Sequence, residues 1–146
     1  MKIIQATQEN LEQLLPLFEG YRVFYKQEPN TEAAKSFLES RFQLKDSVIF
    51  LAFDSSNNAV GFTQLYPSFS SVSMQRVYIL NDLFITSDSR GKGFGEALLN
   101  HAKQFAIENN SKGLILETDI ENPAQKLYER LGWIKDEDVF HYTWKV

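Results

Sequence analysis

The feature that most constrains this chain is a glycine-rich hexapeptide, Arg90-Gly91-Lys92-Gly93-Phe94-Gly95. It follows an apolar run from Tyr78 to Thr86 and precedes a segment with the periodicity of an amphipathic helix. Glycines at alternate positions let the main chain approach a ligand closely, because no Cβ atom intervenes and positive φ angles are allowed. The hexapeptide therefore predicts a strand-to-helix loop whose N–H groups, helix dipole and two cations hold a diphosphate.

Size and composition indicate one domain spanning residues 1–146, because 146 residues with 43% hydrophobic content supply one compact core. The net charge of −4 argues against a nucleic-acid-binding surface and favours a cationic partner. No segment reaches about 18 apolar residues, and the N-terminus lacks a signal-peptide core, so we expect no membrane association and a cytoplasmic location. Without cysteine, and with only two histidines, the chain is expected to hold no metal.

The N-terminal half is predicted to contain a strand, two helices and a β-hairpin. Residues 2–6 form the strand, and Thr7 caps a helix that Pro16 kinks or shortens. A second helix runs from Asn30 or Thr31 to Phe42. The hairpin joins strands at residues 47–53 and 60–66, and the serine-rich residues 67–73 are expected to form a loop.

The C-terminal half is predicted to alternate strands and helices. The expected ranges are 76–86 for a long strand, 93–109 for a helix, 114–118 for a strand, 124–131 for a helix and 139–146 for a closing strand. This order predicts an α/β fold with a mixed, mostly antiparallel central sheet of six to seven strands. About four helices are expected, distributed over both faces of that sheet.

Two familiar nucleotide-binding loops do not fit the hexapeptide. A Rossmann fingerprint requires glycine where Glu96 stands, and a Walker loop requires a spacing that neither Gly91 nor Gly93 begins. The hexapeptide instead resembles the acyl-CoA pyrophosphate loop of the GNAT superfamily of N-acetyltransferases, whose signature is Gln/Arg-x-x-Gly-x-Gly/Ala. Three further segments match that superfamily at the corresponding distances: Asn81 to Thr86, Leu114 to Asp119, and Asn122 to Trp133.

The resemblance implies acetyl-CoA as the cofactor and indicates where it binds. The main chain at Leu83, Phe84 and Ile85 would hold the pantetheine arm at a bulged, splayed strand, with one N–H polarising the thioester carbonyl. The implied cofactor contacts are Leu83, Phe84, Ile85, Arg90, Gly91, Lys92, Gly93, Phe94, Gly95, Glu96, Asn122 and Tyr128.

The resemblance also implies that Tyr128 is the general acid that protonates the CoA thiolate. The alternative is a half-buried helix tyrosine whose hydroxyl bonds a neighbouring carbonyl. Asn122 corresponds to an asparagine that contacts CoA, although an Asn-Pro helix entry alone also explains it.

The general base is left open by the sequence. An amine arrives largely as ammonium, so a carboxylate, or a water ordered by one, must take its proton. Asp82, Glu117 and Glu28 are the acids available near the expected cleft, with Asp82 or Glu117 as the candidate base. Related polyamine enzymes carry a glutamate directly before the acid of this strand, and this chain has Asn81 there, so a water-relayed base stays possible.

The acceptor site is expected at the segment between the first two helices. Its predicted residues are Tyr21, Phe24, Tyr25, Glu28 and Asn81. Aromatic rings hold an ammonium group by cation–π contact and acidic side chains favour it, although the same aromatics can simply fill the edge of the core. Three segments resemble the branch of the superfamily that contains yeast histone and polyamine acetyltransferases: Gly20 to Tyr25, Glu39 to Arg41 and Leu80 to Phe84.

Together these features predict an N-acetyltransferase that moves acetyl from acetyl-CoA to a primary amine by direct transfer in a ternary complex. The acceptor would be a small polyamine or diamine, or a lysine-like or other peptide amine. A non-catalytic CoA-binding regulatory domain and a protein N-terminal acetyltransferase remain alternatives. We also expect a homodimer formed through the C-terminal strand, which carries Phe140, Tyr142 and Trp144.

Overall fold

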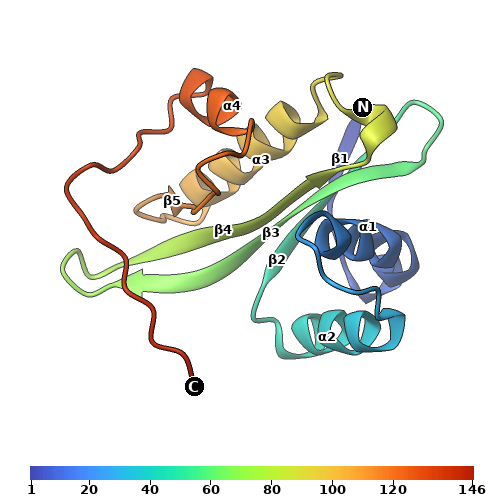
Figure 1. Cartoon of the computed structure of the whole chain (residues 1–146), viewed down its shortest axis with the longest axis horizontal. Helices are drawn as coiled ribbons and strands as arrows, with labels where there is room; N and C mark the ends of the chain where they lie inside the picture. The colour runs from blue at the N-terminus through green and yellow to red at the C-terminus, as the bar shows by residue number, and fades with distance from the viewer.

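A five-stranded sheet forms the middle layer of the structure, a computed structural model that describes residues 1–146 (Figure 1). The strands are ordered β1-β2-β3-β4-β5, with bounds Lys2–Gln5, Val48–Phe53, Ala59–Ser70, Gln75–Ile85 and Leu114–Ile115. Neighbours among the first four strands are antiparallel, whereas β5 runs parallel to β4. The helices are α1 (Leu11–Phe24), α2 (Thr31–Leu44), α3 (Phe94–Glu108) and α4 (Gln125–Arg130), with short 3-10 turns at Gln8–Asn10 and Ser87–Ser89.

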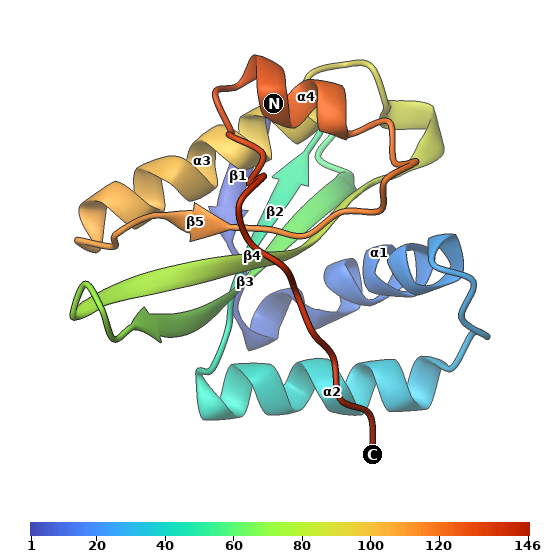
Figure 2. The same ribbon diagram turned by 60° about the vertical axis from the view of Figure 1, so that its left-hand side comes forward.

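Helices cover both faces of the sheet, with α1 and α2 on one side and α3 and α4 on the other (Figures 1 and 2). Each face has its own core cluster. Leu14, Leu38 and Phe62 belong to the cluster under α1 and α2, whereas Phe50 and Leu98 belong to the cluster under α3. Alternation of side chains along the strands divides the apolar residues between the two layers. None of the helices is long and apolar enough to cross a membrane.

The expected order of helices and strands is confirmed as far as α4, but two segments that contain proline differ from expectation. Helix α1 continues through Pro16 rather than ending there, and burial of Leu11, Leu14, Leu17 and Phe18 accompanies that continuation. The packing outweighs the cost of proline in a helix, about 3 kcal/mol.

The second difference lies in residues 67–73, which were expected to form a loop. Strand β3 instead continues to Ser70, and Pro67 pairs with Tyr78 of β4. Pairing of β3 with β2 ends at Leu65, so Pro67 has no β2 neighbour that would need its missing N–H.

The sheet contains five strands rather than the expected six to seven. Strand β5 is limited to two residues, and the expected strand at residues 139–146 is wrong because that segment is extended and exposed, with no ladder. The alternation of Phe140, Tyr142 and Trp144 favours a strand, but no neighbouring strand in this chain pairs with it.

Two irregularities in β4 prepare the site. A bulge places Asn81 between the pairs Leu65↔Leu80 and Gln64↔Asp82. An extra residue reverses the side-chain alternation, so Leu80 packs under α3 whereas Phe84 packs under α1. Pairing of β4 with β5 also stops at Ile79↔Ile115, and beyond this pair the two segments of the chain separate.

Phe62→Ala tests how much the core cluster under α1 and α2 contributes to the stability of the fold through Phe62. Phe62 is 0% exposed and its ring meets those of Phe18, Tyr21 and Phe84, so truncation should lower the free energy of unfolding by about 3–5 kcal/mol. Urea unfolding monitored by circular dichroism measures the loss, with the 97%-exposed Val72→Ala as control. A loss below about 1 kcal/mol, as expected for a surface change, would contradict this packing.

Candidate active site

A cavity of about 560 Å³ lies where β4 and the chain after β5 separate. Its wall combines the C-terminal end of α1, the second half of β4, the glycine loop with the start of α3, the residues after β5, and α4. Of the twelve predicted cofactor contacts, Lys92 alone is absent from this wall. Of the predicted acceptor residues, Phe24, Tyr25 and Asn81 line it.

The glycine loop presents an unbroken series of free N–H groups. Gly91 and Gly93 have φ angles of 73° and 86°, the left-handed region that favours glycine. No N–H from Gly91 to Glu96 has an acceptor within the protein, and Gly93 begins α3 without a side-chain cap. Six successive donors at the positive end of a 15-residue helix form a site for an anion such as a pyrophosphate.

The charged residues around the loop have different neighbours. Arg90 donates from Nε to the Ile85 carbonyl at 3.0 Å, and its guanidinium lies 5.6 Å from the Phe24 ring centroid. It therefore connects the loop to both β4 and α1. Lys92 is exposed outside the cavity wall, and Glu96 pairs with Arg130 at 3.0 Å, which links the first turn of α3 to α4.

Gly95 lies where the first turn of α3 contacts α4. A Cβ atom built at this position would lie 3.4 Å from Cδ2 of Leu127, an ordinary van der Waals contact with the end of a flexible side chain. A methyl group therefore fits here, and only a longer side chain would press on α4, which carries Tyr128.

The main chain of β4 faces the cavity at alternate residues. The Thr86 N–H donates to the Val60 carbonyl of β3 at 2.9 Å. In an antiparallel pair this direction alternates, so the main-chain groups of Leu83 and Ile85 point away from β3, into the gap left by β5. The Ile85 carbonyl accepts from Arg90, which leaves both groups of Leu83 and the N–H of Ile85 without a partner. An extended ligand arm can pair with these groups as an added strand would.

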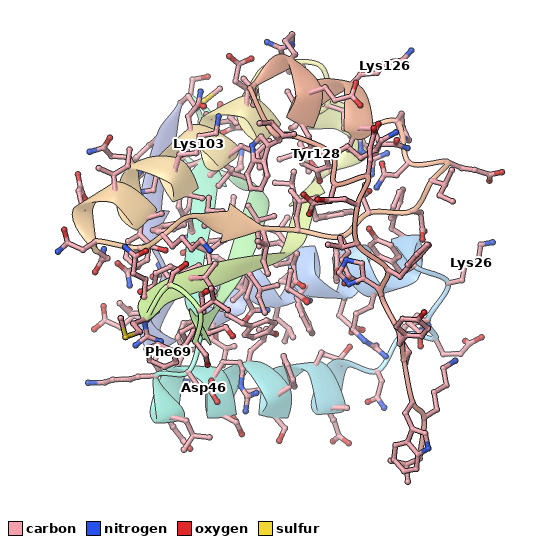
Figure 3. All side chains as sticks on the ribbon, turned by 90° about the vertical axis from the view of Figure 1, so that its left-hand side faces the viewer. Lys26, Asp46, Phe69, Lys103, Lys126 and Tyr128 are labelled. Atoms are coloured by element: carbon pink, nitrogen blue, oxygen red, sulfur yellow. The ribbon has the colours of Figure 1, made fainter.

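Tyr128 lies on the inner side of α4, whereas Lys126 points away from the body (Figure 3). The side chain lines the cavity, is 9% exposed and packs against Trp133 with ring centroids 6.0 Å apart. Burial raises the pKa of Tyr128 to about 12, so the phenol keeps its proton at neutral pH. Its hydroxyl makes no hydrogen bond within the chain, in contrast to the alternative in which it bonds a neighbouring carbonyl.

Asn122 acts locally as a helix-entry residue and also reaches the cavity. Its Oδ1 accepts a hydrogen bond from the Ala124 N–H at 3.0 Å, as the Asn-Pro interpretation predicts. Because the same side chain lines the cavity, the two interpretations do not exclude each other.

Asp82, the first candidate base, is held inside the fold. It is 2% exposed and accepts hydrogen bonds from Gln64 Nε2 at 2.6 Å and from Asn81 Nδ2 at 2.7 Å. Burial raises the pKa of Asp82, while the hydrogen bonds from Asn81 and Gln64 oppose the rise. Asp82 does not line the cavity itself, so any proton must reach it through Asn81, Tyr21 or water.

Glu117, the second candidate, lies in the opposite environment. It lines the cavity, but its side chain is 81% exposed and lies 3.3 Å from Nδ1 of His141. A solvated carboxylate of this kind can attract a cation but lacks the enclosed surroundings that tune a base.

The aromatic residues of α1 form the wall opposite α4. Phe24 and Tyr25 line the cavity, and Tyr21 lies behind them, with its hydroxyl donating to the Asn81 carbonyl at 3.3 Å. Burial and the neighbouring Asp82 raise the pKa of Tyr21. Glu28 is not brought to the cavity; its carbonyl accepts from Arg22.

Sequence analysis missed polar residues of the cavity wall such as Ser89, Thr118 and Arg130, and also Gln64, which lies behind the wall beside Asp82. Gln64 is fully buried on β3 and donates to Asp82, while its Oε1 has no partner. Its polar side chain between Phe62 and Leu65 was an available signal, because a buried amide in an apolar strand normally has a polar neighbour.

Comparison with known proteins agrees with this geometry. An uncharacterized N-acetyltransferase of Bacillus subtilis, YhfO, is 44% identical over all of this chain and 98% of its own length. A crystal structure of a probable acetyltransferase superposes with a TM-score of 0.95 at 42% identity, covering 100% of this chain and 98% of the other. An aminoglycoside N-acetyltransferase solved in complex with CoA shares the fold at 20% identity, with a TM-score of 0.81 over 99% of this chain and 95% of its own. A model of the acetyltransferase (GNAT) family matches residues 11–133. The chain therefore belongs to the GNAT family and is an N-acetyltransferase.

Proposed function

We propose that the protein transfers acetyl from acetyl-CoA directly to a primary amine while both substrates are bound. The observation that carries this proposal is that one cavity joins the glycine loop, the free main-chain groups of β4, Tyr128 and the aromatic end of α1. A diphosphate-bearing donor and a cationic acceptor can therefore meet without a covalent enzyme intermediate. The chain has no cysteine to form such an intermediate through a thiolate.

On the donor side, the free N–H groups from Gly91 to Glu96 bind the pyrophosphate. The outward main-chain groups of Leu83 and Ile85 hold the extended arm, and an N–H there stabilises negative charge on the carbonyl oxygen. Bound acetyl-CoA supplies an activated thioester carbonyl. The neutral Tyr128 hydroxyl donates a proton to the sulfur as the carbon–sulfur bond breaks, which avoids release of a bare thiolate. The second proton, which the nitrogen loses as the amide forms, returns through water to the Tyr128 oxygen and restores the phenol.

On the acceptor side, the ammonium must lose a proton before its nitrogen lone pair can attack. We assign Asp82 as the final acceptor of this proton, which water relays, while Asn81 holds the carboxylate by a hydrogen bond. Its buried position gives it a raised pKa and thus greater basicity than an exposed aspartate. Glu117 contributes negative potential at the entrance rather than proton transfer.

The acceptor is a primary amine on a small, flexible molecule. Phe24 and Tyr25 offer ring faces for an ammonium or a methylene chain, and the net charge of −4 favours a cation. CoA release from acetyl-CoA, measured with a panel of diamines, polyamines, lysine and peptide α-amines, tests this assignment. Acetylation restricted to peptide α-amines would show that the acceptor is a peptide N-terminus rather than a small amine. Acetyl-CoA binding without CoA release in any mixture would contradict catalysis and favour the CoA-binding regulatory domain.

Tyr128→Phe should reduce kcat by about 100-fold, because general-acid catalysis contributes about 10²–10⁴ in rate. The acetyl-CoA Kd should change little, since the ring and its packing on Trp133 are retained. Steady-state kinetics and calorimetry measure the two quantities. An unchanged kcat would remove Tyr128 from the proton-donor role.

Gly93→Val should weaken acetyl-CoA binding by about tenfold or more. The φ angle of 86° costs a residue with a Cβ atom about 1–2 kcal/mol, and relief of this strain would rotate the free N–H groups away from the anion. Gly113→Val is the matched control, since its site is open and its φ is not in the left-handed region. Equal Kd values for the two variants would show that the loop conformation does not hold the cofactor.

The pH dependence of kcat/KM should distinguish the two candidate bases. A base must be deprotonated to act, so the raised pKa of Asp82 predicts that activity falls on acidification at a higher pH than for an exposed aspartate. Asp82→Asn should lower activity strongly and abolish this acidic limb, whereas Glu117→Gln should keep the limb. Loss of the acidic limb in Glu117→Gln but not in Asp82→Asn would identify Glu117 as the base instead.

A further inference from the structure

Gln64 of β3 is a buried amide that uses only half of its hydrogen-bonding capacity. It is 0% exposed, and its Nε2 donates to Oδ2 of Asp82 at 2.6 Å. Its Oε1 is buried as well and has no hydrogen-bond partner. A buried polar atom without a partner destabilises a fold, so an unpaired acceptor beside a titratable group points to a second state of the site in which that acceptor is used.

Asp82 has no cation that balances its charge. None of the ion pairs in the structure includes it, and its two carboxylate oxygens accept hydrogen bonds from side-chain amides. Asn81 donates to Oδ1 at 2.7 Å from the cavity side, where it is exposed, whereas Gln64 donates to Oδ2 from the buried side. Water or a ligand can compete for Asn81 but cannot reach Gln64. Gln64 is therefore the partner that Asp82 keeps whatever occupies the cavity.

The titratable groups around Asp82 on α1 and β3 are three tyrosines: Tyr21, Tyr25 and Tyr66. Burial is the largest cause of the raised pKa of each tyrosine, and the charge of Asp82 adds to it. These hydroxyls therefore keep their protons at neutral pH. The charged groups that act on Tyr66 from α2 and the turn after it are Arg41 and Asp46, which pair with each other at 3.1 Å. No neighbouring cation thus holds Asp82 in its ionised form.

The spacing of the two side chains suits both protonation states of Asp82. Hydrogen bonds to a carboxylate from N–H groups measure about 2.7–2.9 Å, and those from a hydroxyl to an oxygen about 2.5–3.0 Å, so a separation of 2.6 Å is close to both. An amide carries a donor and an acceptor of similar size, which a half-turn about Cγ–Cδ exchanges. Tyr66, two residues along the same face of β3, adds a hydroxyl that either donates or accepts.

We propose that Gln64 is a positioning residue that serves Asp82 in both protonation states. While Asp82 is ionised, the amide N–H donates to Oδ2. When Asp82 takes up the proton that the substrate ammonium loses, this proton resides on Oδ2, the amide makes a half-turn, and Oε1 accepts from the new O–H. Oδ1 keeps its hydrogen bond from Asn81 throughout. Release of the proton to water reverses the half-turn before the next turnover.

This inference rests on the proposed role of Asp82 as the base and explains how a buried base can act repeatedly. A fixed cation beside Asp82 would hold it ionised, and a fixed acceptor would hold it protonated. A side chain that is donor and acceptor in turn keeps the two protonation states close in free energy. A general base needs this balance, because it must both take up and release a proton near the working pH.

Gln64→Met tests the proposal, since it removes the amide and keeps the length of the side chain. Loss of a hydrogen bond to the charged form should raise the pKa of Asp82 by about one to two pH units. Carbon-13 NMR of the side-chain carboxyl groups measures this pKa, and the Asp82 signal is the one that Asp82→Asn removes. Thr63→Val is the matched control, because the Thr63 hydroxyl donates to the main-chain oxygen of Asp82 at 2.7 Å and not to its carboxylate. Its carboxyl pKa should equal that of the wild type.

The wild-type protein supplies a second measurement that does not depend on how well a variant folds. The side-chain carbonyl carbon of Gln64 should move downfield as Asp82 becomes protonated, with the same midpoint, because its oxygen then accepts a hydrogen bond. A Gln64 carbonyl signal that stays constant through the titration of Asp82 would overturn the proposal. An unchanged pKa of Asp82 in folded Gln64→Met would overturn it as well.

The pH dependence of kcat/KM separates this inference from the assignment of the base. With Asp82 as the base, the acidic limb of Gln64→Met should move to higher pH by the same amount as the carboxyl pKa, since a base is inactive when protonated. A shifted carboxyl pKa with an unshifted limb would contradict Asp82 as the base, yet support the pairing of Gln64 with both states of its carboxyl group. An unshifted carboxyl pKa contradicts the pairing whichever group is the base.

Discussion

The separation of β4 from β5 beyond the pair Ile79↔Ile115 is the constraint on which the site depends. Within a sheet, main-chain donors and acceptors satisfy one another; here one side of β4 is left free for a ligand. The bulge at Asn81 adds to this effect, since it places Asp82 under α1 and leaves Leu83 and Ile85 toward α3. One inserted residue thus directs the Asp82 side chain into one layer and the side chains of Leu83 and Ile85 into the other.

The two halves of the cavity are built by different physical means. The half that we propose binds the donor relies on backbone geometry, with positive φ angles at Gly91 and Gly93 and free N–H groups before α3. The half that we propose binds the acceptor relies on side chains from α1 and on the hydrogen bonds around Asp82. Arg90 joins the halves, because it binds the Ile85 carbonyl and stacks near Phe24. A backbone-built donor site tolerates change elsewhere, so the acceptor side can vary while the chemistry persists.

Sequence patterns were sufficient wherever the signal is local. The glycine loop, the helix after it and the β-hairpin follow from spacing and turn residues, and eleven of the twelve predicted cofactor contacts line the cavity. Sequence patterns were insufficient where the position of another strand determines the local structure. Pro67 continues a strand because β2 has already ended beside it, and Gln64 matters because β4 places Asp82 opposite it. Residues 139–146 have the alternating pattern of a strand, but no strand of the sheet pairs with them. Periodicity carries no information about which strand, if any, is the neighbour.

The brevity of β5 has a dynamic consequence. Two residue pairs attach the C-terminal wall of the cavity to the sheet, whereas β3 and β4 share a ladder from Gly61 to Ser70. Local opening that breaks few hydrogen bonds requires less free energy than global unfolding. Opening of the segment from β5 to α4 therefore breaks few sheet hydrogen bonds, and the packing of Tyr128 within the core cluster under α3 is the contact that resists it. A bulky product that leaves along this wall would leave the antiparallel strands undisturbed.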